Sequence, residues 1–296
     1  MSAAAENSSA HPSGALVTGE FSFSAANFRE IAEIAKTEAG IDLPQSKATL
    51  VYSRLAKRLR ALGIDTFSEY CETVRSNDDE RDSMIAALTT NVTRFFREAH
   101  HFEHLRSAII EPLADSARRG NRVRLWSAAC STGQEPYSMA LTVLSVIPNA
   151  ASLDVRILAT DLNPHVIAHG KNGQYQKEEL RDVPPNLRAK WFEPVPGDNR
   201  GALKIADDAR SLVSFRQLNL MGTWPFSGPF DAIFCRNVVI YFDRETQSMI
   251  WNRLTRMLRP EGALYIGHSE RISGPASSML STDGITSYRR KSGQSS

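Results

Sequence analysis

The sequence predicts an α/β fold, in which a parallel sheet with helices on both faces carries a small antiparallel β insertion and follows an all-α domain. Three observations support this prediction. From Phe21 to about residue 119, apolar residues recur every three to four positions, which indicates helices. Beyond Arg122, strand-like runs alternate with helical stretches, which is typical of a parallel sheet. Residues at about 191–213 place Pro, Gly, Asp and Asn between two short strand candidates, which predicts the insertion.

The composition is that of an ordinary globular protein of 296 residues, 42% hydrophobic and 23% charged, with a net charge of +2 that predicts no particular partner. We expect residues 1–20 to form a disordered tail, because they are rich in Ala, Ser and Gly and lack the basic start and apolar core of a signal peptide. No run approaches the roughly 18 apolar residues of a membrane span, so we expect no membrane insertion. Three dispersed cysteines without metal spacing favour a reducing, cytoplasmic compartment.

We expect the helical domain and its linker to cover residues 21–119, and its second helix, at about 45–62, has a basic face. Leucine and valine residues share one side of this helix. The other side carries Arg54, Lys57 and Arg58. Two interpretations are open: a solvated face whose long side chains shield apolar neighbours, or a docking surface for an acidic partner.

A segment without helical periodicity, Thr89–Glu98, leads from the helical domain towards the sheet and is a natural lid or linker. Its Phe95-Phe96 pair is expected to belong to the core. Polar side chains alternate along it, so an extended backbone would turn them to one side, where they could line a site. These side chains belong to Asn91, Thr93 and Arg97.

The stretch Val123–Leu141 predicts a strand, a tight turn at Gly133 and a helix with Pro136 in its first turn. The turn lacks the G-x-G-x-x-G pattern of dinucleotide sites, and Glu135 stands where a phosphate would meet a carboxylate, so a nicotinamide or flavin nucleotide is not expected. A positively charged nucleoside such as S-adenosylmethionine would suit this acid. Alternatively, Glu135 only complements the helix dipole, and the spacing does not separate these interpretations.

Polar residues also follow the other predicted strands, and polar side chains gathered at several strand ends favour a ligand site. Asp161 ends the second strand, where nucleoside-binding sheets hold a ribose diol; the alternative is a helix cap, although Asn163 already offers one. Later strand ends carry Asn219-Leu220 and Arg236-Asn237, the latter with Tyr241 a few residues on.

Five stretches together resemble the chemotaxis receptor methyltransferases, the CheR family. They occur in the family's order over about residues 25–290, and five in order are far more specific than any one. The stretches are Ala87–Glu98, Ala129–Ser138, Ala159–Asn163, Phe230–Phe242 and Leu258–Gly262.

The resemblance implies a Rossmann-like S-adenosylmethionine-dependent methyltransferase domain at about residues 120–296. Its reaction would move a methyl group to glutamate side chains on the cytoplasmic helices of chemoreceptors, giving glutamyl methyl esters and S-adenosylhomocysteine. In this chain the cofactor contacts would be Asn91, Thr93, Arg97, Glu135, Asp161, Asn219, Leu220, Arg236 and Asn237. Asp161 would hold the ribose, Glu135 the charged methionine end and Asn219-Leu220 the adenosine side, with Arg97 and Tyr241 near the methyl.

The resemblance also implies partner surfaces. The receptor-facing residues would be Arg54, Lys57, Arg58 and Arg60. In relatives that tether to a receptor's C-terminal tail peptide the β insertion is the docking site, but Pro194 and Pro196 in this insertion leave tethering open. We expect a monomer. We also expect no binding to nucleic acid, because the basic stripe lacks interleaved aromatic residues.

The implied chemistry needs no general base, since a glutamate carboxylate, with a reference pKa of about 4.3, is ionised near neutrality. No catalytic triad, carboxylate pair or metal cluster stands out, and His268, alone at a strand end, is expected to be structural. We expect Arg97 to orient a carboxylate and Tyr241 to form a wall beside the methyl. Two alternatives are a methyltransferase for another carboxylate and a silent S-adenosylmethionine-binding sensor or scaffold.

Overall fold

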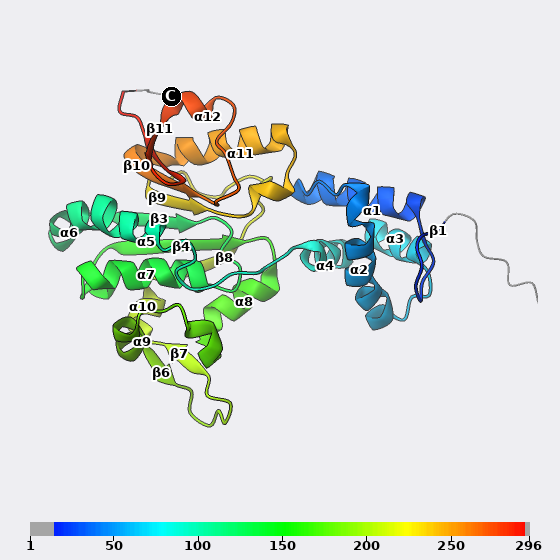
Figure 1. Cartoon of the computed structure of the whole chain (residues 1–296), viewed down its shortest axis with the longest axis horizontal. Helices are drawn as coiled ribbons and strands as arrows, with labels where there is room; N and C mark the ends of the chain where they lie inside the picture. Colours follow the sequence, from blue (N-terminus) through cyan, green and yellow to red (C-terminus); the bar gives the residue numbers. More distant parts are fainter. Residues whose placement is uncertain (1–14, 294–296) are drawn as a thin grey trace, which may run out of the picture. The chain divides into compact units, whose positions relative to one another are not determined.

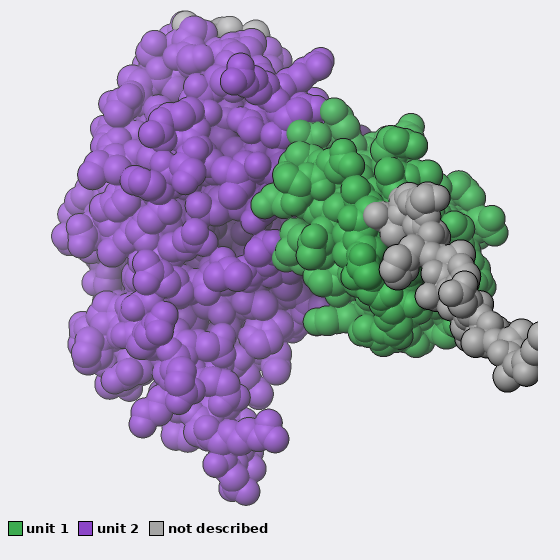
Figure 2. Space-filling model, turned by 45° about the vertical axis from the view of Figure 1, so that its right-hand side comes forward, with its two compact units in different colours: residues 1–88 green, residues 89–296 purple. Residues whose placement is uncertain are grey.

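The computed structural model describes residues 15–293 and divides into two compact units, a helical unit at Met1–Leu88 and a sheet unit at Thr89–Ser296 (Figures 1 and 2). Residues 1–14 of the predicted tail lie outside the described residues. Its last part is ordered, because Ala15–Val17 form strand β1, which pairs antiparallel with β2 at Phe23–Ser24. Among residues 15–293, no helix combines the length and apolar character that crossing a membrane requires.

The helical unit is built from four helices whose ends follow from their capping residues. Ser24 accepts a hydrogen bond from the Asn27 backbone in a capping box, and Gly40 and Gly63 end the first two helices in the left-handed conformation. Phe23 and Leu55 are fully buried between the helices. The helices are α1 (Ala25–Ala39), α2 (Ala48–Leu62, after a 3-10 turn at Gln45–Lys47), α3 (Phe67–Ser76) and α4 (Asp78–Leu88).

The sheet unit contains a seven-stranded sheet in the order β11-β12-β10-β9-β3-β4-β8. Its parallel strands, taken along the chain, lie in the spatial order 3-2-1-4-5, with a topological switch point between β3 and β9. The parallel strands are β3 (Val123–Ser127), β4 (Val155–Asp161), β8 (Val213–Gln217), β9 (Phe230–Cys235) and β10 (Leu258–Ile266). The predicted parallel sheet is confirmed, but the sequence did not show the antiparallel hairpin β11 (Leu280–Gly284) and β12 (Ser287–Arg290) that extends it.

Helices cover both faces of the sheet (Figure 1). Neighbouring strand residues alternate between the two cores: Leu125 belongs to the core under α7, and Trp126 to the core under α11, beside Trp251. The helices are α5 (His100–His104), which continues through a π-helical turn (Leu105–Ile110) into α6 (Glu111–Arg118), then α7 (Gln134–Val146), α8 (Pro164–Asn172), α11 (Arg244–Met257) and α12 (Ala276–Met279), with 3-10 turns at Ala150–Ser152 and Val239–Tyr241.

Residues 89–119 group with the sheet, whereas we expected the helical domain and its linker to extend to residue 119. The physical reason is the burial of aromatic and aliphatic side chains from this segment. Phe95, Phe102 and Ile109 lie in the core formed by α7 and the sheet.

The predicted insertion is a three-stranded antiparallel sheet in the order β5-β7-β6. Its two expected strands are β6 (Phe192–Pro194) and β7 (Leu203–Ile205), and a third strand, β5 (Gln174–Tyr175), joins from before the predicted region. A 3-10 turn (Lys177–Leu180), α9 (Pro185–Trp191) and α10 (Asp207–Ser211) complete this part of the chain.

Candidate cofactor site at the carboxyl edge of the sheet

The turn from β3 to α7 lies at the switch point, and its backbone is adapted to close packing. Gly133 has a φ of 98°, and a Cβ added there would stand 2.7 Å from the Tyr175 hydroxyl and 3.0 Å from the Cα of Gly170. Glycine is therefore required at this position for both conformation and space. Pro136 lies in the first turn of α7, as predicted.

Glu135, also in this first turn, is buried and points to β9. Its carboxylate accepts a 2.7 Å hydrogen bond from the Ser127 hydroxyl and lies 3.0 Å from Nη1 of Arg236. Burial raises the pKa of Glu135, and the Arg236 charge opposes that rise. Glu135 is thus part of a buried ion pair rather than only an exposed complement to the helix dipole.

Arg236, at the end of β9, lies between two carboxylates. Its side chain is 2% exposed, its Nη2 lies 3.3 Å from Oε2 of Glu98, and the same nitrogen donates to the Arg97 carbonyl. The cluster Glu98–Arg236–Glu135 therefore joins three separate segments. Sequence reasoning missed Glu98, although it stands next to Arg97 in the stretch that carries the family resemblance.

Asp161, at the end of β4, is held by backbone donors. Its Oδ2 accepts from the Ser131 N–H at 2.8 Å and its Oδ1 from the Asn163 N–H at 3.0 Å. Burial raises the pKa of Asp161, and these hydrogen bonds oppose the rise. Asn163 itself caps α8 by accepting from the His165 N–H at 2.9 Å, as the sequence indicated, so Asp161 does not cap this helix.

The segment Thr89–Glu98 is not helical, as predicted, and contacts this edge of the sheet. The Asn91 carbonyl accepts a 2.8 Å hydrogen bond from the Ser131 hydroxyl, and Arg97 donates to the Val92 carbonyl at 3.1 Å. Phe95 is fully buried, as expected, whereas Phe96 is half-buried. Thr93 is also half-buried.

Backbone strain concentrates at this edge. Within residues 15–293, six non-glycine residues have a positive φ, and four of them lie in the segments just described or directly after β9. These four are Phe96, Glu98, Ser131 and Asn237. Strained conformations of this kind persist where the surrounding structure holds them, and they are common at functional sites.

The connection after β9 carries Asn237 and Tyr241, and a second missed acid holds it. Glu270 is 2% exposed, and its carboxylate accepts backbone hydrogen bonds from residues 237, 238, 239 and 267. Tyr241 ends the 3-10 turn that follows and is half-buried. Neither local periodicity nor spacing signals such an acid, because three of its four partners, the N–H groups of residues 237, 238 and 239, lie more than thirty residues earlier in the chain.

Asn219 and Leu220 follow β8 and form a turn in which the Asn219 side chain accepts from the Met221 N–H at 2.9 Å. Arg253 of α11 donates to the Leu220 carbonyl at 2.6 Å, which fixes the turn to the sheet unit. The Leu218 N–H, just before this turn, donates to the Asp161 carbonyl at 2.9 Å. Asn219 therefore follows directly after a residue that is bonded to the end of β4.

The predicted basic residues of α2 lie in the helical unit, and most of them have partners there. Arg58 forms an ion pair with Glu80, which is 5% exposed, and Glu80 also accepts from the Tyr70 hydroxyl at 2.8 Å. The hydrogen bond to Glu80 raises the pKa of Arg58. Arg60 pairs with Glu20 at 2.6 Å, Arg54 donates to the Leu88 carbonyl, and Lys57 is exposed. The stripe is therefore less free than its sequence suggests.

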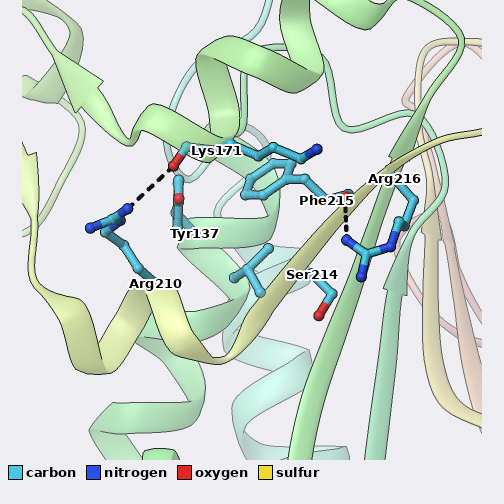
Figure 3. A pocket seen from close by; sticks show the side chains of 7 residues that line it. Tyr137, Lys171, Arg210, Ser214, Phe215 and Arg216 are labelled. Atoms are coloured by element: carbon cyan, nitrogen blue, oxygen red, sulfur yellow. Dashed lines mark hydrogen bonds between the residues drawn. The ribbon is translucent and has the colours of Figure 1, made fainter.

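A separate pocket of about 230 Å³ opens along β8, between α7, α8 and α10 (Figure 3). None of the predicted cofactor residues lines it. The lining residues are Tyr137, Lys171, Arg210, Val213, Ser214, Phe215 and Arg216.

The sheet order, the glycine turn after β3 and the acid that ends β4 define a nucleoside-binding α/β domain. Residues 91–288 match the family model for "CheR methyltransferase, SAM binding domain", and residues 26–89 match "CheR methyltransferase, all-alpha domain". The chain belongs to the CheR methyltransferase family, and its cofactor is S-adenosylmethionine.

Individual relatives agree with this assignment. A "Probable chemotaxis protein methyltransferase" of Rhizobium etli is 52% identical over 86% of this chain and 95% of that protein. The "Chemotaxis protein methyltransferase" of Escherichia coli is 40% identical over 87% of this chain and 88% of that protein. Among solved structures, PKMT2 from Rickettsia typhi in complex with AdoHcy matches with a TM-score of 0.34 and 18% identity, covering 60% of this chain and 26% of that chain. The predicted family, fold class and cofactor are confirmed.

The donor set at this edge fits S-adenosylmethionine. Two buried carboxylates, Glu135 and Asp161, stand beside the glycine turn, and the one buried guanidinium described there, that of Arg236, is already balanced by acids. Such an edge suits a cationic nucleoside better than a phosphate-bearing one.

Proposed function

We propose that this protein transfers a methyl group from S-adenosylmethionine to glutamate side chains on the cytoplasmic helices of chemoreceptors, forming glutamyl methyl esters. The observation that carries the proposal is the membership in the CheR family over both domains, together with a strained, acid-lined carboxyl edge. S-adenosylmethionine, when bound, supplies an electrophilic methyl group.

The proposed cofactor residues keep the roles given by the resemblance, with one refinement. Asp161 holds the ribose, and its orientation is supported by the two backbone donors. Glu135 faces the positively charged methionine end. Arg236 supports Glu135 and Glu98 as their counter-ion, because its charge is shared between these acids. The remaining proposed contacts are Asn91, Thr93, Arg97, Asn219, Leu220 and Asn237.

The substrate carboxylate needs no deprotonation, so the protein contributes mainly by positioning, which can supply roughly 7–11 kcal/mol. We assign Arg97 to orienting a carboxylate and Tyr241 to forming one wall of the reaction site. Both residues lie on segments that are held at the edge by buried hydrogen bonds: Arg97 on the strained segment before α5, and Tyr241 on the connection after β9.

The proposed partner surfaces are the exposed cations of α2 for the receptor helices and the three-stranded insertion for a receptor tail peptide. Lys57 is the α2 cation best placed for direct contact, because Arg58 and Arg60 already pair with acids. Pro194 pairs with Leu203 inside β6 and β7, so the prolines did not prevent the insertion from forming strands. We propose that the protein acts as a monomer in the cytoplasm.

The test is transfer of radiolabelled methyl from S-adenosylmethionine to receptor-containing membranes. We expect base-labile label that is released as methanol, which identifies an ester, and no transfer to receptors whose candidate glutamates are replaced by alanine. Equal transfer to unrelated glutamate peptides would favour a broader carboxylate methyltransferase. Calorimetric binding of S-adenosylmethionine with no transfer to any receptor would overturn the proposal in favour of a silent sensor.

A further inference from the structure

Glu270 is a buried acid whose carboxylate is satisfied by the backbone. It follows β10 by four residues, is 2% exposed, and accepts four N–H groups: from Asn237 at 2.9 Å, from Val238 and Val239 at 3.0 Å each, and from Gly267 at 2.5 Å. In the described part of the chain, no cation forms an ion pair with it. Burying a carboxylate without a cation is costly, and only a full set of charge-assisted hydrogen bonds offsets that cost.

The three donors from residues 237–239 are consecutive, and they belong to a backbone that would not hold this shape alone. Asn237 has a φ of 59°, a left-handed conformation that asparagine tolerates better than most residues but that still carries strain. A turn in which consecutive N–H groups converge on one acceptor forms a small anion-binding nest. The Glu270 carboxylate therefore occupies this nest as a permanent internal anion.

Gly267 allows the acid and the turn to meet. A Cβ added at Gly267 would lie 2.6 Å from Nδ2 of Asn237, 2.8 Å from its backbone nitrogen and 2.8 Å from Oε2 of Glu270. The backbone nitrogen of Asn237 and Oε2 of Glu270 are hydrogen-bonded to each other, so a side chain at residue 267 would force this pair apart. The ends of β9 and β10 are thus joined through Glu270 and Gly267.

The connection held in this way presents Asn237 and Tyr241 at the carboxyl edge beside Arg236. We propose that Glu270 is a positioning residue for methyl transfer, which holds the backbone of residues 237–239 so that the Asn237 amide and the Tyr241 ring stand in their working places. This inference rests on the proposed function for the reaction, but the placement of Asn237 can be tested by ligand binding alone.

The test compares Glu270→Gln with Glu270→Asp, Gly267→Ala and the control Glu261→Gln. Glutamine keeps the size but offers one acceptor oxygen and turns an NH2 group towards N–H donors. Glu261 is an exposed glutamate that also has a positive φ, on β10. For each folded variant, kcat, the KM for receptor and the calorimetric affinity for S-adenosylhomocysteine are measured.

We expect Glu270→Gln to lower kcat by about 10- to 100-fold and to weaken S-adenosylhomocysteine binding, with the KM for receptor changed less than about threefold, because the docking surfaces proposed above, α2 and the insertion, do not include this turn. Glu270→Asp should recover part of kcat, and Gly267→Ala, which leaves the acid in place, should reproduce the loss. Glu261→Gln should behave as wild type. If Glu270→Gln does not fold, Gly267→Ala decides.

A folded Glu270→Gln or Gly267→Ala protein with wild-type kcat and wild-type S-adenosylhomocysteine affinity would overturn the inference. Absence of methyl transfer by the wild-type protein would instead overturn the proposed function. In that case the binding measurements on the same variants still decide whether Glu270 positions Asn237.

Discussion

At the scale of single residues, the Glu98–Arg236–Glu135 cluster shows how buried charges shape the candidate site. Arg236 lies within 3.3 Å of both carboxylates, and its side chain is 2% exposed. Buried ion pairs contribute little net stability compared with apolar replacements, but removing one partner leaves the other uncompensated. The cluster is therefore better explained by the need to fix three segments than by stability.

Replacing Arg236 with methionine should therefore destabilise the protein by about 3–5 kcal/mol near neutral pH, because the buried Glu135 and the partly buried Glu98 lose their counter-ion. The deficit should shrink as the pH falls, since the unpaired acids take up protons in the folded variant. Chemical denaturation followed by circular dichroism at several pH values measures this. The exposed Arg216→Met serves as the control, and a deficit that is constant with pH would argue against the ionic explanation.

Arg97 and Arg94 form a matched pair for testing the chemistry. Arg97 is half-buried and donates to the Val92 carbonyl, whereas Arg94 is exposed and lies 3.5 Å from Asp182. We expect Arg97→Ala to lower methyl-transfer turnover about 100-fold through lost positioning, and Arg94→Ala to change it little. Near-normal turnover of Arg97→Ala with unchanged cofactor affinity, in the radiolabel and calorimetric assays, would remove its assigned role.

The residues found from the sequence differ in kind from those that were missed. Asp161 and Asn237 stand at or just after the ends of strand-like runs, and Glu135 opens the helix that follows one; strand ends are visible as the point where an apolar pattern stops. Glu98 and Glu270 were missed because their significance comes from burial. A carboxylate on a loop carries no local sign that distant N–H groups or a guanidinium will enclose it.

At the scale of elements, periodicity predicted the helices and strands whose patterns repeat along the local sequence. It failed for strands whose pairing depends on distant parts of the chain. The alternating strands and helices after Arg122 and the insertion turn were predicted correctly. The hairpin of β11 and β12 was missed because its strands are short and it is added to a sheet edge whose position the local sequence does not encode. Strand β5 was missed for the same reason: it is only two residues long.

The α2 helix illustrates why a charge pattern alone overstates a docking surface. Replacing Lys57 with glutamate should raise the KM for receptor without loss of stability, because Lys57 is exposed. Arg58→Glu should instead cost about 2 kcal/mol of folding stability, since the partly exposed Arg58 is the counter-ion of the buried Glu80. Methylation kinetics and denaturation curves for the two variants separate docking from folding. A KM unaffected by Lys57→Glu would contradict a receptor-facing role for this side chain.

At the scale of the whole molecule, His101 makes the fold sensitive to acid. It is fully buried, and its Nε2 lies 2.8 Å from the Thr286 hydroxyl and 3.2 Å from the Ile285 carbonyl, which ties α5 to the C-terminal hairpin. Burial, with the nearby Arg236 charge, lowers the pKa of His101 from 6.5 to about 3. The folded protein therefore keeps this imidazole neutral over a pH range in which the unfolded chain protonates it.

The sign follows from linkage. Between pH 6.5 and about 3 the unfolded state binds the extra proton, so the free energy of unfolding should fall as the pH falls, by up to about 1.4 kcal/mol per pH unit from this group. In His101→Gln the free energy of unfolding should depend less steeply on pH in this range, because the variant lacks the one proton that His101 takes up on unfolding. Denaturation at closely spaced pH values measures the slope, and equal slopes for variant and wild type would show that His101 is not responsible.

The division into two units has an optical consequence. All four tryptophans, Trp126, Trp191, Trp224 and Trp251, lie in the sheet unit, and the helical unit has none. Trp126 and Trp251 are fully buried, and Trp126 packs edge-to-face on Trp224 with ring centroids 4.9 Å apart. Indole fluorescence should therefore report the unfolding of the sheet unit and not that of the helical unit. Far-UV circular dichroism follows the helices of both units. The difference between the two unfolding midpoints then measures how independently the two units unfold.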